Sequence, residues 1–135
     1  MSIQALEAVL PGLGARRIEV PRRIDWRVVF DGLGAELPDD YVTLAEYCPR
    51  LEIGQFLCVT SPAPGREAIF VERERADLSS AGDMAQDDML GGYPVFPEPG
   101  GLLRWGSSID GDEFHWRTAG LPNEWTVLVA GAVNF

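Results

Sequence analysis

The sequence of residues 93–106 is YPVFPEPGGLLRWG, and it predicts where the helical part of the chain gives way to a sheet. Three prolines precede a Gly-Gly pair, and proline cannot continue a helix because it lacks the amide donor and clashes with the preceding turn. Gly100 and Gly101 then supply backbone angles that other residues reach only with strain. We therefore expect a tight corner, followed by short strands joined by turns.

Residues 110–117 and 125–129 continue the strand pattern beyond this corner. The Asp-Gly pair at the start of the first segment is a hairpin turn signal, so we expect a loop from residue 106 to residue 111. Phe114 and Trp116 then alternate with polar residues, and successive side chains of a strand point to opposite faces. We expect the aromatic side chains to point inward and His115, with its polar neighbours, to point outward.

The first half of the chain predicts three helices. One spans residues 2–13, and a second begins after the N-cap residue Asp25 and ends at Gly34. The third opens at residues 38–40, where two aspartates complement the positive end of the helix dipole, and Pro49 stops it. These aspartates favour helix initiation over a catalytic carboxylate pair.

Between the helices and the corner, residues 53–60 predict a central strand because a compact apolar run is flanked by glycine and proline. Residues 66–88 favour a helix, with a break at residues 79–82. The four arginines within residues 16–23 indicate a solvated connector; an anion-binding patch is the alternative.

Length and composition indicate one ordinary globular domain of 135 residues. No apolar run approaches the roughly 20 residues that span a bilayer, and the N-terminus lacks the basic and apolar regions of a secretory signal. We therefore expect a cytoplasmic protein. Cys48 and Cys58 are the only cysteines, and we expect two reduced, half-buried thiols, with a disulfide as the alternative.

The charge is informative about partners. The net charge is −10, and residues 76–135 contain nine acidic residues and two arginines, a net charge of −7. Such a surplus repels nucleic acid phosphates and anionic membrane surfaces and attracts basic partners. Nucleic acid and membrane binding are therefore disfavoured, although plain solubility explains the same charge.

The residues offer little for catalysis. His115 is the only histidine, so any Ser-His-Asp or Cys-His arrangement must include it, and no G-x-S-x-G elbow is present. Asp110, Asp112 and Glu113 could ligate a divalent cation, but the spacing fits a turn with solvated acids better. No P-loop lysine follows the Gly-Gly pair, because the chain contains no lysine. We expect no catalytic residue, no metal and no cofactor.

The ordered combination of several short motifs resembles the SUKH superfamily, which groups bacterial toxin-immunity proteins with yeast regulators of cell-wall assembly. The matching residues are Ile24-Asp25-Trp26, Leu33-Gly34, Leu37-Pro38-x-Asp40-Tyr41, Ser61-Pro62, Tyr93-Pro94, Pro99-Gly100-Gly101-Leu102-Leu103-x-Trp105-Gly106, Gly111-Asp112-x-x-x-Trp116 and Pro122-x-x-Trp125-x-Val127.

This resemblance implies an α+β fold over residues 1–135, with a central antiparallel sheet flanked by helices and no catalytic residues. Relatives usually continue into a terminal amphipathic helix, whereas this sequence stops at Phe135. The resemblance therefore implies a domain whose C-terminal helix is missing, either by truncation or because another chain or a rearranged N-terminus covers that face. Homo-oligomerisation stays open for the same reason.

We expect a protein-binding immunity factor that neutralises a cognate toxin or effector domain, with basic nuclease toxins as natural candidates. Apolar anchors at the sheet edge would give affinity, and acidic residues would speed the encounter. The candidate contact residues are Asp83, Asp87, Asp88, Asp110, Asp112 and Glu113. One alternative is a regulatory or scaffold module that binds a housekeeping protein; another is a metal-dependent hydrolase built on residues 110–115.

Overall fold

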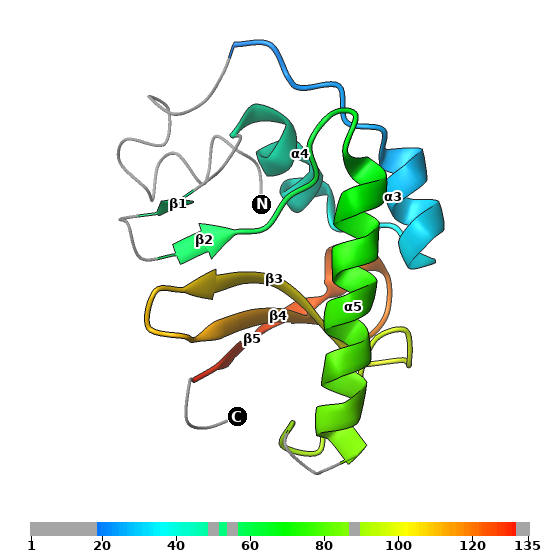
Figure 1. Cartoon of the computed structure of the whole chain (residues 1–135), viewed down its shortest axis with the longest axis vertical. Helices are drawn as coiled ribbons and strands as arrows, with labels where there is room; N and C mark the ends of the chain where they lie inside the picture. The colour runs from blue at the N-terminus through cyan, green and yellow to red at the C-terminus, as the bar shows by residue number, and fades with distance from the viewer. Residues whose placement is uncertain (1–18, 49–51, 54–56, 87–89, 132–135) are drawn as a thin grey trace.

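The structure, a computed structural model, describes residues 19–48, 52–53, 57–86 and 90–131. Within these ranges, helices lie against an antiparallel sheet (Figure 1), which confirms the expected α+β class. The elements in chain order are α3 (Trp26–Leu33), α4 (Asp39–Tyr47), β1 (Glu52–Ile53), β2 (Leu57–Val59), α5 (Glu67–Gln86), β3 (Leu102–Ser108), β4 (Glu113–Arg117), the 3₁₀ helix η1 (Pro122–Glu124) and β5 (Thr126–Ala130). The predicted N-terminal helix over residues 2–13 lies outside the described residues.

The described strands form a sheet in sequence order, β1-β2-β3-β4-β5, and every neighbouring pair is antiparallel. The prediction of a central strand over residues 53–60 is confirmed in part: β2 lies between β1 and β3, but it spans only Leu57–Val59, and Ile53 belongs to β1. The middle position of the five belongs to β3. Its longer run allows β3 to pair with β2 on one side and β4 on the other.

Helices α3 and α4 follow the sequence pattern. The Asp25 side chain accepts a hydrogen bond from the Val28 amide, and Gly34 ends α3 in the left-handed region at φ 83°. Helix α4 carries both predicted aspartates in its first turn. Its residue Tyr41 is buried and contacts the Trp116 ring edge to face, with centroids 4.9 Å apart. The predicted ends of α3 and the acidic first turn of α4 are confirmed, whereas Pro49, the predicted stop of α4, lies outside the described residues.

The expectation of two half-buried thiols is wrong in detail. Both cysteines are reduced, but Cys48 is buried at the end of α4 and Cys58 on β2 is exposed. Cys48 belongs to the buried stripe of an amphipathic helix, whereas the pleat of a three-residue strand turns Cys58 away from the core.

Helix α5 runs without interruption through residues 79–82, so the predicted break there is wrong. A serine pair and a glycine lower intrinsic helix propensity by about 1 kcal/mol per residue at most. Leu78, Ala81 and Met84 line a hollow against Leu90 and the sheet, so tertiary contact with neighbouring segments outweighs the weak local preference.

The N-terminal half of α5 is fixed against α3. A methyl group on Gly32 would lie 2.6 Å from the Val71 side chain, so only glycine allows the two helices to approach this closely. Arg75 donates to the Gly32 carbonyl, and the buried Glu67 carboxylate accepts a 2.8 Å hydrogen bond from the Asp25 amide. This amide hydrogen bond is the main cause that holds the pKa of Glu67 below its usual value.

The two glycines of the corner act in different ways. Gly100 has φ 76°, as the sequence predicts. Gly101 instead provides space, because a Cβ there would lie 2.4 Å from backbone atoms of Val95 and Phe96. The Gly101 carbonyl also accepts hydrogen bonds from the amide and hydroxyl of Thr118, which fixes the corner to the segment after β4.

The loop predicted from residue 106 is shorter than expected, because β3 continues to Ser108. Gly106 and Ser107 pair with β2, and a Cβ on Gly106 would lie 2.8 Å from the Cys58 carbonyl oxygen. The predicted Asp-Gly turn is present, with Gly111 at φ 89°.

His115 is only 7% exposed, so the prediction that it points outward into solvent is wrong. The alternation itself is correct, but α5 lies over the face that was expected to be solvated (Figure 1). The sheet therefore has two covered faces. The helix face, toward α5, carries Leu102, Arg104, Glu113 and His115. The aromatic face carries Leu103, Trp105, Phe114, Trp116, Val127 and Val129.

Candidate functional site

The predicted contact acids lie at two separate places. Asp110 is exposed and Asp112 half-buried in the β3–β4 turn, while Asp83 is exposed near the end of α5. In Figure 1 the turn lies at the left side of the sheet, whereas the end of α5 lies at the bottom of the molecule. Asp87 and Asp88 lie outside the described residues. The fold therefore does not bring Asp83 and the turn residues into one acidic patch.

Two of the turn acids are engaged within the chain. The Asp112 amide and carboxylate both contact the Ser108 hydroxyl, which closes the turn. Glu113 accepts a 3.2 Å hydrogen bond from Arg104 and lies 3.2 Å from His115. Part of the capacity of these carboxylates to bind a partner is thus already used, and Asp110 is the most accessible acid of this turn.

Strand β5 forms the edge of the described sheet and exposes large apolar side chains. Val127 and Val129 are 56% and 59% exposed, and they share the aromatic face with their β4 partners Trp116 and Phe114. An exposed edge strand offers both unpaired backbone groups and apolar contacts to another chain.

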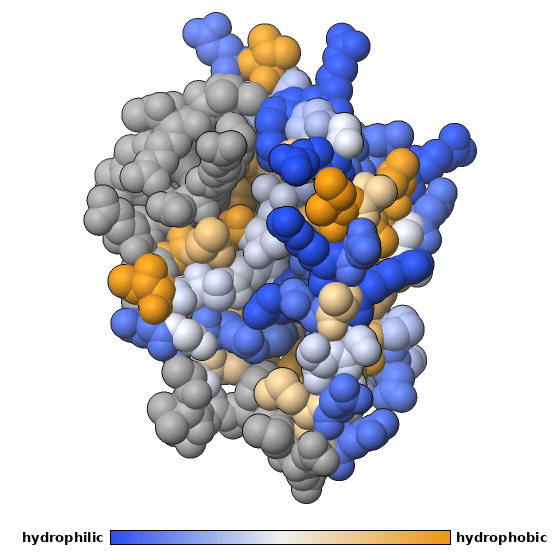
Figure 2. Space-filling view, in the orientation of Figure 1, coloured by the Kyte–Doolittle hydropathy of each residue, from blue (hydrophilic) through white to orange (hydrophobic). Residues whose placement is uncertain are grey.

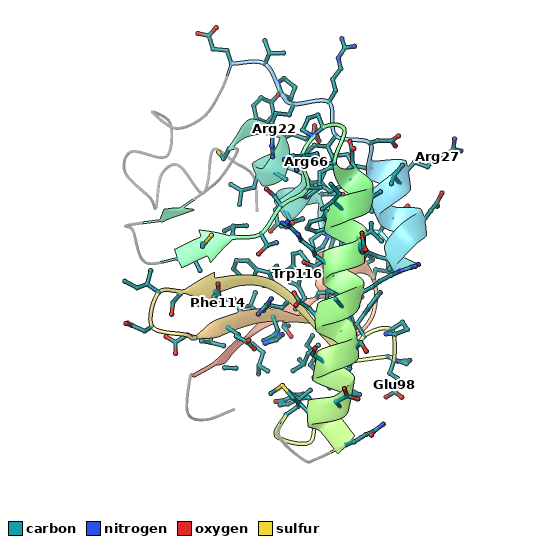
Figure 3. The ribbon with its side chains drawn as sticks, viewed as in Figure 1. Arg22, Arg27, Arg66, Glu98, Phe114 and Trp116 are labelled. Atoms are coloured by element: carbon teal, nitrogen blue, oxygen red, sulfur yellow. The ribbon has the colours of Figure 1, made fainter. Side chains whose placement is uncertain are left out.

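Behind β5, aromatic rings pack in a continuous series. Trp105 contacts Phe114 and Trp116 at centroid distances of 5.6 and 6.1 Å, and Trp116 contacts Trp125 at 5.8 Å. Figure 3 shows Phe114 and Trp116 on the sheet. The exposed apolar side chains of β5 therefore lie beside a packed series of rings.

An acidic hollow adjoins this edge. It has a volume of about 350 Å³ and lies between the start of α4, η1 and β5. Asp39 and Asp40 line one side and Trp116, Trp125 and Val127 the other. Asn123 holds the Asp39 carboxylate through its side-chain amide at 3.0 Å and accepts from the Asp39 backbone amide at 2.9 Å. Carboxylates beside aromatic rings are suited to a guanidinium or ammonium group.

Sequence reasoning missed this hollow. The two aspartates have an adequate local explanation at the first turn of α4, and nothing in the sequence places them beside Trp125. The contact with Asn123 bridges 84 positions along the chain, so only the folded chain reveals it.

His115, the only histidine of the chain, is buried on β4 beside Glu113. Burial lowers the pKa of His115, although Glu113 opposes the shift, so the imidazole is neutral near pH 7. Within the described ranges, no three His, Cys, Asp or Glu side chains are grouped so that they could hold a metal ion. Among the described helices, none is long and apolar enough to cross a membrane.

Comparison of the chain with models of known protein families, with curated protein sequences and with solved structures found no match.

Proposed function

We propose that this chain is a protein-binding immunity factor that holds a basic toxin or effector domain in an inactive complex. The observation that carries the proposal is the exposed β5 edge, with Val127 and Val129, beside the hollow lined by Asp39 and Asp40. An apolar anchor next to fixed carboxylates is the pattern of a surface that receives a basic side chain and then excludes water around it.

The charge distribution supports a basic partner. Residues 76–135 carry a net charge of −7, and β5 with both flanking turns belongs to this part of the chain. Complementary charge accelerates encounter and disfavours acidic partners. The resemblance of the motifs to the SUKH superfamily supports the finer proposal of an immunity role, and a nuclease toxin is the basic partner that fits this charge best.

The test is association with the protein that the neighbouring gene encodes. We expect Val127→Arg to weaken binding at least about tenfold, because it places a cation and a long side chain where an apolar contact forms. We expect Asp40→Lys to slow association and to reduce its dependence on salt. Titration calorimetry and stopped-flow fluorescence measure the two effects.

Asp83→Lys is the matched control, because it reverses the same charge on an exposed position of α5 that does not line the hollow. If Asp83→Lys slows association as much as Asp40→Lys, net charge and not the hollow guides the partner. If Val127→Arg leaves affinity unchanged, the β5 edge is not the contact surface. An isolated gene whose product instead copurifies with a housekeeping protein would favour the regulatory or scaffold role.

A further inference from the structure

A groove of about 870 Å³ separates α5 from the segment that follows β2, and the proposed protein contact does not use it. Four of the chain's eleven arginines line it, which is unexpected in a protein of net charge −10. They are Arg22, Arg66, Arg73 and Arg104. The volume falls within the usual range for small-molecule sites.

The groove is built along one stripe of α5. Arg66, Phe70, Arg73 and Asp77 recur at intervals of three or four residues and all line the groove, so they share one side of the helix. Residues 58–63 form the opposite wall. Figure 2 shows hydrophilic residues along much of the visible side of α5, with a few hydrophobic ones among them.

The arginines differ in what they contact. Arg104 forms ion pairs with Asp77 and Glu113 and closes one end of the groove. Arg66 and Arg73 are exposed and form no ion pair with any described residue. Arg22 donates from Nε and Nη2 to the Ala45 and Pro62 carbonyls, which fixes its guanidinium at the other end. Figure 3 shows Arg22 and Arg66 near the start of α5.

The interior of the groove combines apolar surface with one carboxyl group. Val59, Phe70 and Ile69 supply apolar surface. Glu74 is 6% exposed and lines the groove, and the charges of Asp77 and Arg104 act on its carboxyl group. Because Glu74 lines the groove, a ligand bound there would come into contact with it.

We propose that this groove binds a small phosphate-bearing molecule with an apolar or aromatic body, the chemistry that a nucleoside diphosphate supplies. Arg66 and Arg73 contact the phosphates, Arg22 orients them, and Phe70 with its apolar neighbours contacts the body. Guanidinium groups bind phosphate oxygens through paired hydrogen bonds. The chain has no lysine, so the use of arginine here is not informative by itself. The gathering of four arginines around one groove is what indicates a phosphate site.

Glu74 couples this binding to protons. Burial, followed by the Asp77 carboxylate, raises the pKa of Glu74 to about 7, and Arg104 opposes the rise. The protonated carboxyl donates to a phosphate oxygen, whereas the charged form repels it. The other titratable or charged groups that face Glu74 are Tyr41 from α4, Asp77 from α5, Arg104 from β3, Glu113 and His115 from β4, and Arg22 and Arg73 along the groove.

The test measures ADP, inorganic pyrophosphate and adenosine against the purified chain by titration calorimetry. We expect ADP to bind, pyrophosphate to bind more weakly, and adenosine not to bind. Arg66→Gln and Arg73→Gln each lower ADP affinity about tenfold, as the loss of one charge-assisted contact implies. Arg27→Gln is the matched control, because this exposed arginine points away from the groove (Figure 3).

Other results of these measurements would contradict one part of the proposal each. Absence of ADP and pyrophosphate binding, or equal losses in Arg27→Gln and Arg73→Gln, overturns the site. Equal affinity for ADP and pyrophosphate overturns the apolar body. Titrations in two buffers of different ionisation enthalpy measure the number of protons that are taken up when ADP binds. Near pH 7.5 we expect proton uptake with the native chain and a smaller uptake with Glu74→Gln. The same uptake in both overturns the role of Glu74.

This inference does not depend on the immunity role, because the groove and the hollow beside β5 share no lining residue. A chain that binds ADP but associates with no protein contradicts the immunity role alone. A chain that associates with a basic protein but does not bind ADP contradicts the groove proposal alone.

Discussion

The two faces of the sheet differ in which side chains they cover and which they expose. The helix face is covered by α5, yet it holds the half-buried ion pair of Arg104 and Glu113 beside the buried imidazole of His115. The aromatic face is apolar, yet it leaves Val127 and Val129 exposed at β5. Burying charges is costly and exposing apolar edges invites association, so a fold optimised for stability alone would avoid both. The buried core therefore lies at the centre of the aromatic face, around Leu103 and Trp116, while Val127 and Val129 lie outside it.

The largest expected effect tests the centre of the aromatic face. Trp116→Ala should destabilise the chain by about 3–5 kcal/mol, because it removes a buried ring that contacts Tyr41, Trp105 and Trp125. Urea denaturation followed by circular dichroism measures the change. A loss below about 1 kcal/mol would mean that the aromatic face does not provide the core.

The next effect concerns the helix face. The pKa of Glu74 is raised from the usual 4.5 to about 7, so the protonated carboxyl group favours the folded state. Its contribution to the free energy of unfolding is therefore present below pH 4.5 and is lost as pH rises through about 7. Glu74→Gln should therefore stabilise the chain at pH 8 by up to about 3 kcal/mol and have little effect at pH 4.

Glu72→Gln is the control for this change, since Glu72 is exposed on the same helix. Denaturant titrations at several pH values check both variants. A gain for Glu74→Gln that does not vary with pH would contradict the assigned cause.

A smaller effect of opposite sign is expected at the start of α5. Because the pKa of Glu67 is lowered, its charged form favours the folded state; the contribution is present above the usual value of 4.5 and is lost as pH falls through the folded value. Glu67→Gln should cost about 1–2 kcal/mol at pH 7, since a charge-assisted hydrogen bond to the Asp25 amide weakens. The deficit should shrink in acid; a deficit that is constant between pH 7 and pH 3 would instead indicate a packing defect.

The smallest effect tests the margin of the aromatic face. Val127→Ser should change the free energy of unfolding by less than about 0.5 kcal/mol, because most of this side chain is exposed. Thermal denaturation measures it, and a loss above about 1 kcal/mol would show that the β5 edge is covered within the chain and is not available to a partner.

The sequence by itself determined the features that depend on neighbouring residues. The Asp25 and Gly34 caps, the two aspartates that open α4, the corner at Gly100 and the Asp-Gly turn all follow from local hydrogen bonds and backbone angles. The alternation of Phe114 and Trp116 with polar residues was also predictable, because the period of a strand is fixed.

Only the tertiary structure decided what covers each face. The position of α5 buries His115 and Glu74, keeps the helix continuous through Gly82, and creates the arginine-lined groove. Likewise, the hydrogen bonds between Asp39 and Asn123 bring an acidic helix start beside β5. The physical reason is that a local pattern gives the two sides of a strand or helix, whereas burial and charge pairing depend on segments that are distant along the chain.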